Sequence, residues 1–269
     1  MSDFDNKVVI VTGGGYGIGE STAKSFGDEG ASVTVLDIDE DAGRRTVDSI
    51  KSNGGKALFV LGDVSQGSDC ERAVNETVNA FGGVDILFNN AGIQPPDWYV
   101  KIEEYSEEMW DKIIGVNLRG YFLMMKYALP EIRKRGSGSV INVASVHSFQ
   151  SQKGVPAYDA SKGAIVALTK QVALDYAEDN IRILAVCPGA MDTKLLRTMA
   201  EREADPEKAV EDWGKTHPLG RIGTGQDIAN MALFLASEKA SFMTGESVLV
   251  DGGYMALGAW AVIDPSKEE

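Results

Sequence analysis

Three side chains in the middle of the chain have the types and spacing needed for acid–base chemistry: Ser145, Tyr158 and Lys162. Tyr158 and Lys162 are four residues apart in a helical pattern, so they share one helix face. An ammonium beside a phenol favours the phenolate and lowers a pKa that is normally about 10, which would let Tyr158 act as a general base. Ser145 ends a predicted strand 13 residues earlier, and its hydroxyl can donate to a substrate oxygen. Either pattern alone also arises by chance, so the rest of the chain must provide the context.

A glycine-rich turn near the start of the chain has the pattern of a dinucleotide-binding site. It follows an apolar run, opens a helical pattern and reads Thr12-Gly13-Gly14-Gly15-Tyr16-Gly17-Ile18-Gly19. Glycines let the backbone approach a pyrophosphate, and the helix N-terminus offers amide donors. The alternative is a purely structural turn. The pattern predicts cofactor contacts from Gly13, Tyr16, Gly17, Ile18 and Gly19.

A carboxylate at the end of the second apolar run predicts which dinucleotide binds. Asp37 lies eighteen residues beyond the glycine turn, where it could accept hydrogen bonds from both ribose hydroxyls and would repel a 2′-phosphate. No Arg or Lys is expected beside it, because Tyr16 lies in the turn and Ile38 follows Asp37. The pattern favours NAD over NADP and makes Ile38 a further contact, with a helix cap as the competing role for Asp37. The candidates for contact with the adenine of the dinucleotide follow the third apolar run and are Asp63 and Val64.

Strands and helices that could position these groups are readable from the hydrophobic pattern. Continuous apolar runs indicate strands covered on both faces, at residues 7–11, 32–36, 57–61, 84–88, 139–143, 181–186 and 247–250. Amphipathic stretches between them include 17–29, 107–133 and 157–177. This alternation predicts one α/β domain over residues 1–269, with a doubly wound parallel sheet flanked by helices. Residues 190–225 are charged and weakly periodic; a helical substrate lid is predicted there, and a surface helix pair fits equally well.

Composition argues against several classes of function. The 269 residues carry 26 Lys and Arg against 40 Asp and Glu, a formal net charge of −14. This balance disfavours binding to nucleic acid or to an anionic membrane surface. The chain has no apolar run long enough for a membrane span, and its start lacks the regions of a signal peptide. Two cysteines and two histidines cannot form a disulfide framework or a multi-histidine metal centre. We expect a cytoplasmic protein, without a metal, that acts on a small molecule.

Together these motifs resemble the short-chain dehydrogenases/reductases over about residues 6–253. The resemblance depends on the glycine turn together with Asn89-Asn90-Ala91-Gly92, Asn117, Ser145, Tyr158-Asp159-Ala160-Ser161-Lys162 and Pro188-Gly189. It implies a Rossmann-type domain with the strand order 3-2-1-4-5-6-7, usually in a homotetramer.

The resemblance also implies a role for each matching position. Tyr158 would accept the proton in alcohol oxidation, Ser145 would polarise the substrate oxygen, and Lys162 would lower the tyrosine pKa and hold the nicotinamide ribose. Asn117 would support a water relay through an irregularity in its helix. Hydride would pass from the carbinol carbon to the nicotinamide. The remaining matches would line the cofactor: Asn90, Ala91, Gly92, Pro188, Gly189, Met191 and Thr193.

Residues after the catalytic strands are the candidates for substrate contact. At positions that the family often uses, the chain has Gln94, His147 and Gln152, next to Ser145 and Tyr158. Two amides and an imidazole suit a polyhydroxylated or carboxylated substrate better than a steroid. His147 could instead be a structural or capping histidine. An apolar wall could come from Trp98, Phe149 and Met191.

Residues 145–152 most resemble those of bacterial sugar and sugar-acid dehydrogenases of this family. We expect an NAD-dependent enzyme that oxidises a secondary alcohol or lactol of a sugar, sugar acid or polyol, since cellular NAD is mostly oxidised. One alternative is a 3-oxoacyl thioester reductase or hydroxysteroid dehydrogenase, which Asp37 and the negative charge disfavour. Another is a non-catalytic dinucleotide-binding protein, which the complete Asn117, Ser145, Tyr158 and Lys162 set disfavours. The C-terminal extension, residues 254–269, is expected to cover the substrate mouth, a neighbouring subunit or the protein's own surface.

Overall fold

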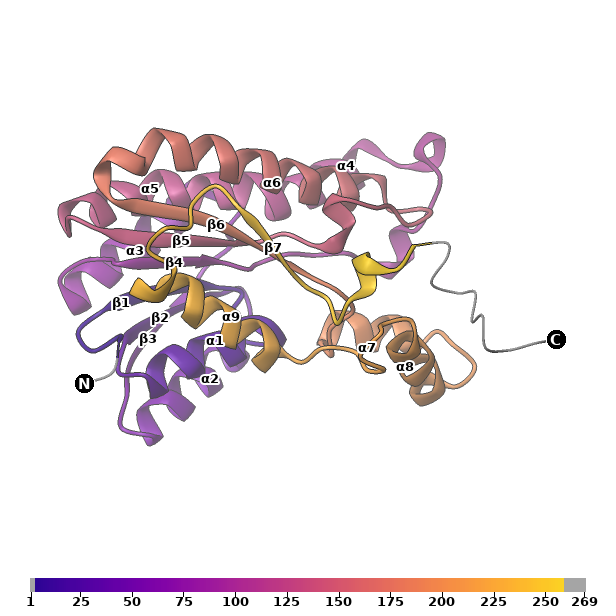
Figure 1. The fold of residues 1–269 in the computed structure, drawn as a ribbon, viewed down its shortest axis with the longest axis horizontal. Helices are drawn as coiled ribbons and strands as arrows, with labels where there is room; N and C mark the ends of the chain where they lie inside the picture. The colour runs from indigo at the N-terminus through magenta and orange to yellow at the C-terminus, as the bar shows by residue number, and fades with distance from the viewer. Residues whose placement is uncertain (1–2, 259–269) are drawn as a thin grey trace.

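One parallel sheet forms the centre of the molecule in the computed structural model, which describes residues 3–258 (Figure 1). Its strand order is β3-β2-β1-β4-β5-β6-β7, as predicted. The strands are β1 (Val8–Thr12), β2 (Ser32–Asp37), β3 (Lys56–Leu61), β4 (Ile86–Asn89), β5 (Gly138–Val143), β6 (Ile181–Pro188) and β7 (Ser247–Val250). The order reverses between β1 and β4, and a ligand crevice is expected at the carboxyl ends of the strands at such a point.

Helices cover both faces of the sheet, which explains the continuous apolar runs. One face carries α1 (Gly17–Asp28), α2 (Glu40–Ser52) and α9 (Gly225–Ala236). The other carries α3 (Gly67–Phe81), α5 (Gly120–Lys134) and α6 (Pro156–Tyr176), with α4 (Glu107–Ile114) beside α6. Every residue of β1 is buried between these layers. The single doubly wound α/β domain is therefore confirmed.

The helix predicted over residues 107–133 contains an irregular turn. Between α4 and α5 the backbone forms a π-helix over Gly115–Arg119. A π-turn inserts one residue into the helical repeat and is frequent at functional sites. Asn117 lies in this turn and is completely buried.

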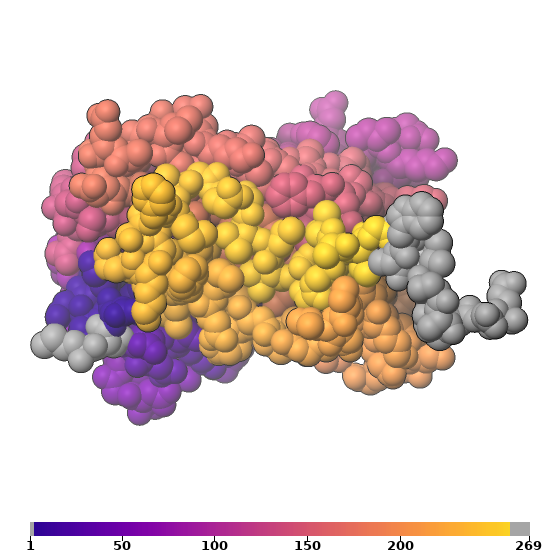
Figure 2. Space-filling view, in the orientation of Figure 1, coloured from indigo at the N-terminus to yellow at the C-terminus, as the bar shows by residue number. Residues whose placement is uncertain are grey.

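Residues 190–225 form a helical unit beyond the carboxyl ends of the strands. It contains α7 (Lys194–Ala200), capped by Thr193, and α8 (Pro206–Lys215), capped by Asp205. In Figure 2 this orange segment lies against the yellow end of the described chain. The contact includes a stacked pair of rings, His217 and Tyr254, whose centroids are 5.0 Å apart. Most of the C-terminal extension, including Trp260, Val262 and Ile263, lies outside the described residues.

Candidate active site

The glycine turn has a geometry that only glycine accommodates. Gly13 has a positive φ of 62°, and Gly17 one of 53°. A Cβ added to Gly19 would lie 2.0 Å from the carbonyl oxygen of Gly13 and 2.6 Å from Nδ2 of Asn90. The turn therefore folds tightly onto the start of α1, with Tyr16 at the N-cap position and Ile18 in the first helical turn.

The N-terminus of α1 is suited to an anion. No side chain caps it, whereas Asp39 caps α2 and Thr224 caps α9. The first amides of a helix have no partner within the helix and carry a partial positive charge, so a pyrophosphate can take the place of a cap. The backbone of residues 13–19 thus fits the diphosphate of a nicotinamide dinucleotide.

The carboxylate of Asp37 lies directly beside this turn. One oxygen accepts the N–H of Gly15 at 2.8 Å and the other accepts the N–H of Asp39 at 2.9 Å. Asp39, not Asp37, is the N-cap of α2, so the competing role of Asp37 as a helix cap is wrong. Held this way, the Asp37 carboxylate remains at the end of β2, where an adenosine ribose is expected. Ile38 beside it is exposed.

The expectation that no Arg or Lys lies near this corner is wrong. Arg45 of α2 lies over the Tyr16 ring, with Cζ 5.9 Å from the ring centroid, and its Nη2 is 3.4 Å from the Tyr16 hydroxyl. The Nζ of Lys194, at the start of α7, lies 4.5 Å from the same centroid. The backbone N–H of Ala42 and the Tyr16 hydroxyl, which donates to Asp39 at 2.8 Å, lower the pKa of Asp39. The sequence did not reveal these cations because the glycine turn, α2 and the start of α7 meet only in the folded protein.

The end of β4 is tied to the glycine turn by hydrogen bonds. The side chain of Asn90 donates to the carbonyl oxygens of Thr12 and Gly13, at 3.0 Å each. The hydroxyl of Thr12 in return accepts the backbone N–H groups of Asn90 and Ala91. Thr12, which was not predicted as a site residue, thus joins the two strands on either side of the crevice. Its position directly before the glycines was the signal that could have identified it.

Two predicted cofactor residues have side chains turned into the core. Val64 is 6% exposed and packs against Gly120. Met191 is also 6% exposed, and its sulfur packs toward Gly223. Both side chains belong to the core, although Met191 also lines a small pocket with Leu219 and Val250, so its contribution to an apolar wall stays a prediction. Asp63 is partly exposed and accepts the N–H of Ser65 at 2.8 Å.

The turn after β6 is supported by a buried histidine. Nε2 of His217 accepts the N–H of Ala190 at 3.2 Å, and Nδ1 donates to the carbonyl oxygen of Trp213 at 3.0 Å. A Cβ added to Gly189 would lie 2.9 Å from His217 Nε2. Thr193, a few residues further along the chain, lies beside Gly17. A Cβ added to Gly17 would be 3.1 Å from Thr193 Cγ2. The Pro188-Gly189 turn and Thr193 are therefore at the same edge of the sheet as the glycine turn.

Asn117 holds the backbone next to the predicted substrate residue Gln94. Its side chain accepts the N–H of Ile93 at 2.8 Å and donates to the carbonyl oxygen of Ile93 at 2.9 Å. The two bonds hold the peptide groups on both sides of Ile93 and so fix the backbone that leads to Gln94. Asn117 lies in the π-turn that the resemblance implied as a helix irregularity, and its side chain reaches the segment that follows β4.

Ser145, Tyr158 and Lys162 meet at the end of β5. Burial raises the pKa of Tyr158 to about 12, although the neighbouring Ser145 hydroxyl acts to lower it. Burial also lowers the pKa of Lys162 to about 8. The Nζ of Lys162 lies 5.6 Å from the centroid of the Tyr158 ring. The predicted lowering of the Tyr158 pKa by Lys162 is therefore wrong for these side chains: a low-dielectric site penalises both charges.

The predicted substrate residues differ in their surroundings. Gln94 is 7% exposed, and its Nε2 has no hydrogen-bond partner among the described residues. Buried amides are normally paired, so this nitrogen is a candidate donor to a ligand. His147 is paired with Asp159, a residue that was not predicted as part of the site. Gln152 has an exposed side chain, and its contact with Asp159 is made by its backbone N–H. Phe149 is half exposed.

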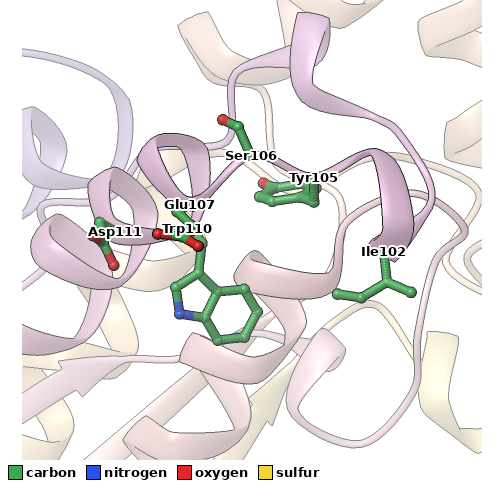
Figure 3. A pocket seen from close by; sticks show the side chains of 6 residues that line it. All are labelled: Ile102, Tyr105, Ser106, Glu107, Trp110 and Asp111. Atoms are coloured by element: carbon green, nitrogen blue, oxygen red, sulfur yellow. The ribbon is translucent and has the colours of Figure 1, made fainter.

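A separate hollow lies on the segment that leads into α4 (Figure 3). It is lined by Ile102, Tyr105, Ser106, Glu107, Trp110 and Asp111. None of the predicted catalytic, cofactor or substrate residues belongs to it, so it is distinct from the candidate active site. Within residues 3–258 we find no cluster of His, Cys, Asp and Glu that could hold a metal ion. No helix in the same range combines the length and the apolar character needed to cross a membrane.

The chain is similar to known oxidoreductases over nearly its whole length. A family model described as enoyl-(acyl carrier protein) reductase matches residues 13–255. A cyclohexanol dehydrogenase of Acinetobacter sp. is 39% identical over 251 residues, covering 93% of this chain and 96% of the relative. An L-fucose dehydrogenase of Mus musculus is 38% identical over 253 residues, covering 94% and 90%.

A solved structure shows the same fold at full length. The aldohexose dehydrogenase of Thermoplasma acidophilum superposes with a TM-score of 0.88 at 38% identity, covering 98% of this chain and 99% of that chain. Family model, relatives and solved structure span nearly the whole chain and include oxidoreductases of alcohol-type donors. The chain belongs to the short-chain dehydrogenase/reductase family, whose dehydrogenases use nicotinamide cofactors.

Proposed function

We propose that this protein is an NAD-dependent dehydrogenase that oxidises a secondary alcohol or lactol of a sugar, sugar acid or polyol. The observation that carries the chemistry is the meeting of Ser145, Tyr158 and the buried Lys162 beyond β5, with the Lys162 Nζ 5.6 Å from the centroid of the Tyr158 ring. In the oxidation the phenolate oxygen of Tyr158 takes the proton of the substrate hydroxyl and becomes a neutral phenol, while Ser145 donates to the same substrate oxygen. Bound NAD supplies the hydride acceptor and a positive nicotinamide ring, which favours the phenolate.

The remaining residues of the proposed site hold the reacting groups in position. Lys162 donates to the carbonyl oxygen of Val143 at 2.8 Å and is 3% exposed, so its ammonium is held at the end of β5. Asn117 fixes Ile93, and through it the position of Gln94. Such fixed groups keep the reacting atoms in one arrangement and reduce the entropy lost on reaching the transition state.

The preference for NAD is supported by the Asp37 carboxylate. It is held beside the glycine turn by two backbone amides, where it would accept from a ribose hydroxyl and repel a phosphate. Arg45 weakens this preference because it lies at the same corner. Its guanidinium is partly offset by the ionised Asp39, so we propose NAD as the main cofactor.

A polyhydroxylated or carboxylated substrate is supported by the polar side chains of Gln94 and His147. It is also supported by the similarity of the chain to an L-fucose dehydrogenase and an aldohexose dehydrogenase. A second candidate class is an alicyclic alcohol, since a cyclohexanol dehydrogenase is equally similar and Phe149 offers an apolar surface. A third candidate function, suggested by the description of the family model, is an acyl-thioester reductase. Against it stand Asp37 and a net charge of −14, which would repel an acidic carrier and a 2′-phosphate.

A substrate panel tests the proposal directly. Formation of reduced nicotinamide is followed by absorbance with NAD against aldoses, aldonic acids, polyols, cyclohexanol and a sterol. We expect the highest kcat/KM for a polyhydroxylated substrate. Activity confined to cyclohexanol would favour the alicyclic class, and reduction of a 3-oxoacyl thioester with NADPH alone would contradict the proposal.

We further propose that the protein acts in the cytoplasm as a homotetramer. Large apolar side chains that are exposed in the single chain support an assembly: Phe122, Leu174 and Phe242. Light scattering coupled to size exclusion would measure the mass, and a monomer at micromolar concentration would contradict this assembly.

A further inference from the structure

The imidazole of His147 is held by a carboxylate next to the proposed catalytic tyrosine. Its Nδ1 lies 2.6 Å from Oδ1 of Asp159, which follows Tyr158 in the first turn of α6. The two side chains are 19% and 15% exposed. The other carboxylate oxygen of Asp159 accepts the backbone N–H of Gln152 at 3.3 Å. Both oxygens of Asp159 are thus engaged in hydrogen bonds.

This contact decides where a neutral His147 ring carries its proton. An ionised carboxylate only accepts hydrogen bonds, so Nδ1 must be the nitrogen that donates. Nε2 is then left with a free lone pair. Within the described residues, the side-chain hydrogen bond of His147 is the one made by Nδ1. Nε2 is therefore available as an acceptor for a ligand.

The ring also borders the proposed reacting centre. It packs edge-to-face on the Tyr158 ring, with the centroids 5.4 Å apart and an interplanar angle of 84°. The backbone N–H of His147 donates to Oγ of Ser145 at 3.1 Å. Ser145 and Tyr158 are in turn the two residues between which a substrate oxygen would bind in the proposed function. His147 thus contacts both residues that would hold the reacting hydroxyl.

We propose that Asp159 is a positioning residue that keeps His147 in the Nδ1–H tautomer, so that Nε2 accepts a hydrogen bond from a second substrate hydroxyl. That hydroxyl would be carried by the carbon next to the oxidised carbinol. The inference rests on the proposed function and narrows its substrate class to vicinal diols. A site built to pair with a hydroxyl rejects an analogue that lacks it, because its polar group is then left unpaired.

The first test compares a diol with its matched mono-alcohol. The kcat/KM with NAD is measured for cyclohexane-1,2-diol and for cyclohexanol, and their ratio is the selectivity. His147→Phe keeps an aromatic ring beside Tyr158 but removes the acceptor, so the selectivity should fall about tenfold, the value of one hydrogen bond. Asp159→Asn should lower the selectivity less than His147→Phe does. Asp175→Asn, an exposed carboxylate farther along α6 that pairs with Gln171, is the matched control and should not change it.

An equal fall of kcat/KM for both substrates in His147→Phe would overturn the proposal. In that case His147 would act on Tyr158 or on the fold rather than on the second hydroxyl. An unchanged selectivity in that variant would also overturn it.

The second test reads the tautomer without any substrate. The chain has two histidines, so nitrogen NMR of protein labelled at histidine gives two ring systems. His217 serves as an internal reference, because it donates from Nδ1 to Trp213 and accepts at Nε2 from Ala190. At a pH where the ring is neutral, His147 should carry its proton on Nδ1, and Asp159→Asn should add the Nε2–H form.

A wild-type His147 protonated on Nε2 alone would overturn the proposal, whatever the activity. If the tautomer is as expected but wild-type protein oxidises no alcohol with NAD, the proposed function and the diol assignment fail. The positioning of His147 by Asp159 would then still stand. The two failures are therefore distinguishable.

Discussion

The ammonium of Lys162 donates a 2.8 Å hydrogen bond to the carbonyl oxygen of Val143, the last residue of β5. The hydroxyl of Tyr121 donates to the same oxygen at 2.9 Å. Helix α6, helix α5 and the strand that leads to Ser145 are thus joined at one buried atom. Because Lys162 is 3% exposed, its charge is confined to a site where water cannot stabilise it, and its pKa is lowered to about 8.

This buried lysine predicts how stability changes with pH. Its pKa is about 8 in the folded protein against an ordinary value of 10.5, so between these values the unfolded chain binds more protons. The contribution of Lys162 to the free energy of unfolding should therefore rise with pH from about 8 to 10, by at most about 1.4 kcal/mol per pH unit. The buried thiols of Cys70 and Cys187, whose pKa values are raised by burial, act in the opposite direction above about pH 9. Urea unfolding at each pH isolates the lysine: the stability of the wild type minus that of Lys162→Met should rise over this range, and a difference independent of pH would contradict the assignment.

Tyr158 predicts the pH dependence of the reaction. Its pKa is raised to about 12, so the phenolate fraction grows with pH throughout the neutral and mildly alkaline range. We expect log kcat/KM for alcohol oxidation to increase between about pH 7 and pH 9, and the reverse reduction to show the opposite trend. Steady-state rates in both directions at constant ionic strength check this. An oxidation rate independent of pH would contradict a tyrosine base.

Removing the Tyr158 hydroxyl should abolish the chemistry and leave the cofactor site largely intact. For Tyr158→Phe we expect kcat to fall by about 10²–10⁴-fold, the usual contribution of a general base. The dissociation constant of NAD, from quenching of tryptophan fluorescence, should change little. Tyr176→Phe, at the far end of α6, is the control and should keep wild-type kcat. Full activity in Tyr158→Phe would remove the proposed mechanism.

Asp37 should control the choice of cofactor. Asp37→Ala removes the charge that repels a 2′-phosphate and leaves Arg45 nearby, so the ratio of kcat/KM for NAD over NADP should fall by about tenfold or more. Adding Arg45→Ala should reverse much of the gain with NADP. Asp41→Ala, an exposed acid in the first turn of α2, is the control. An unchanged ratio in Asp37→Ala would show that discrimination lies elsewhere.

Gly19 should tolerate no side chain. Its Cβ would lie 2.0 Å from the backbone oxygen of Gly13, which cannot move without opening the turn. We expect Gly19→Ala to lose about 1–3 kcal/mol of stability and most NAD binding. Gly163→Ala is the matched control, since a Cβ there meets nothing within 4 Å and helix propensity favours alanine by up to about 1 kcal/mol. Equal thermal stability and NAD affinity of the two variants would contradict this account.

Local patterns in the sequence were sufficient for the architecture and for proposing most of the candidate site. Apolar runs, amphipathic stretches and a glycine turn are properties of neighbouring residues, and the carboxyl ends of parallel strands necessarily meet at one edge of the sheet. The strand order came from the resemblance, not from periodicity. Ser145, Tyr158 and Lys162 could be placed together because two of them share a helix face and the third ends a strand beside it.

The tertiary structure alone decided the properties that depend on burial and on contacts between distant segments. Burial reversed the expected direction of the Tyr158 pKa. Packing turned Val64 and Met191 into the core. The approach of separate segments brought Arg45 to Tyr16, and Asp159 to His147, a pair that spacing along the chain did not reveal. The physical reason is that desolvation and side-chain pairing depend on what surrounds a group in space, and a linear pattern does not contain that information.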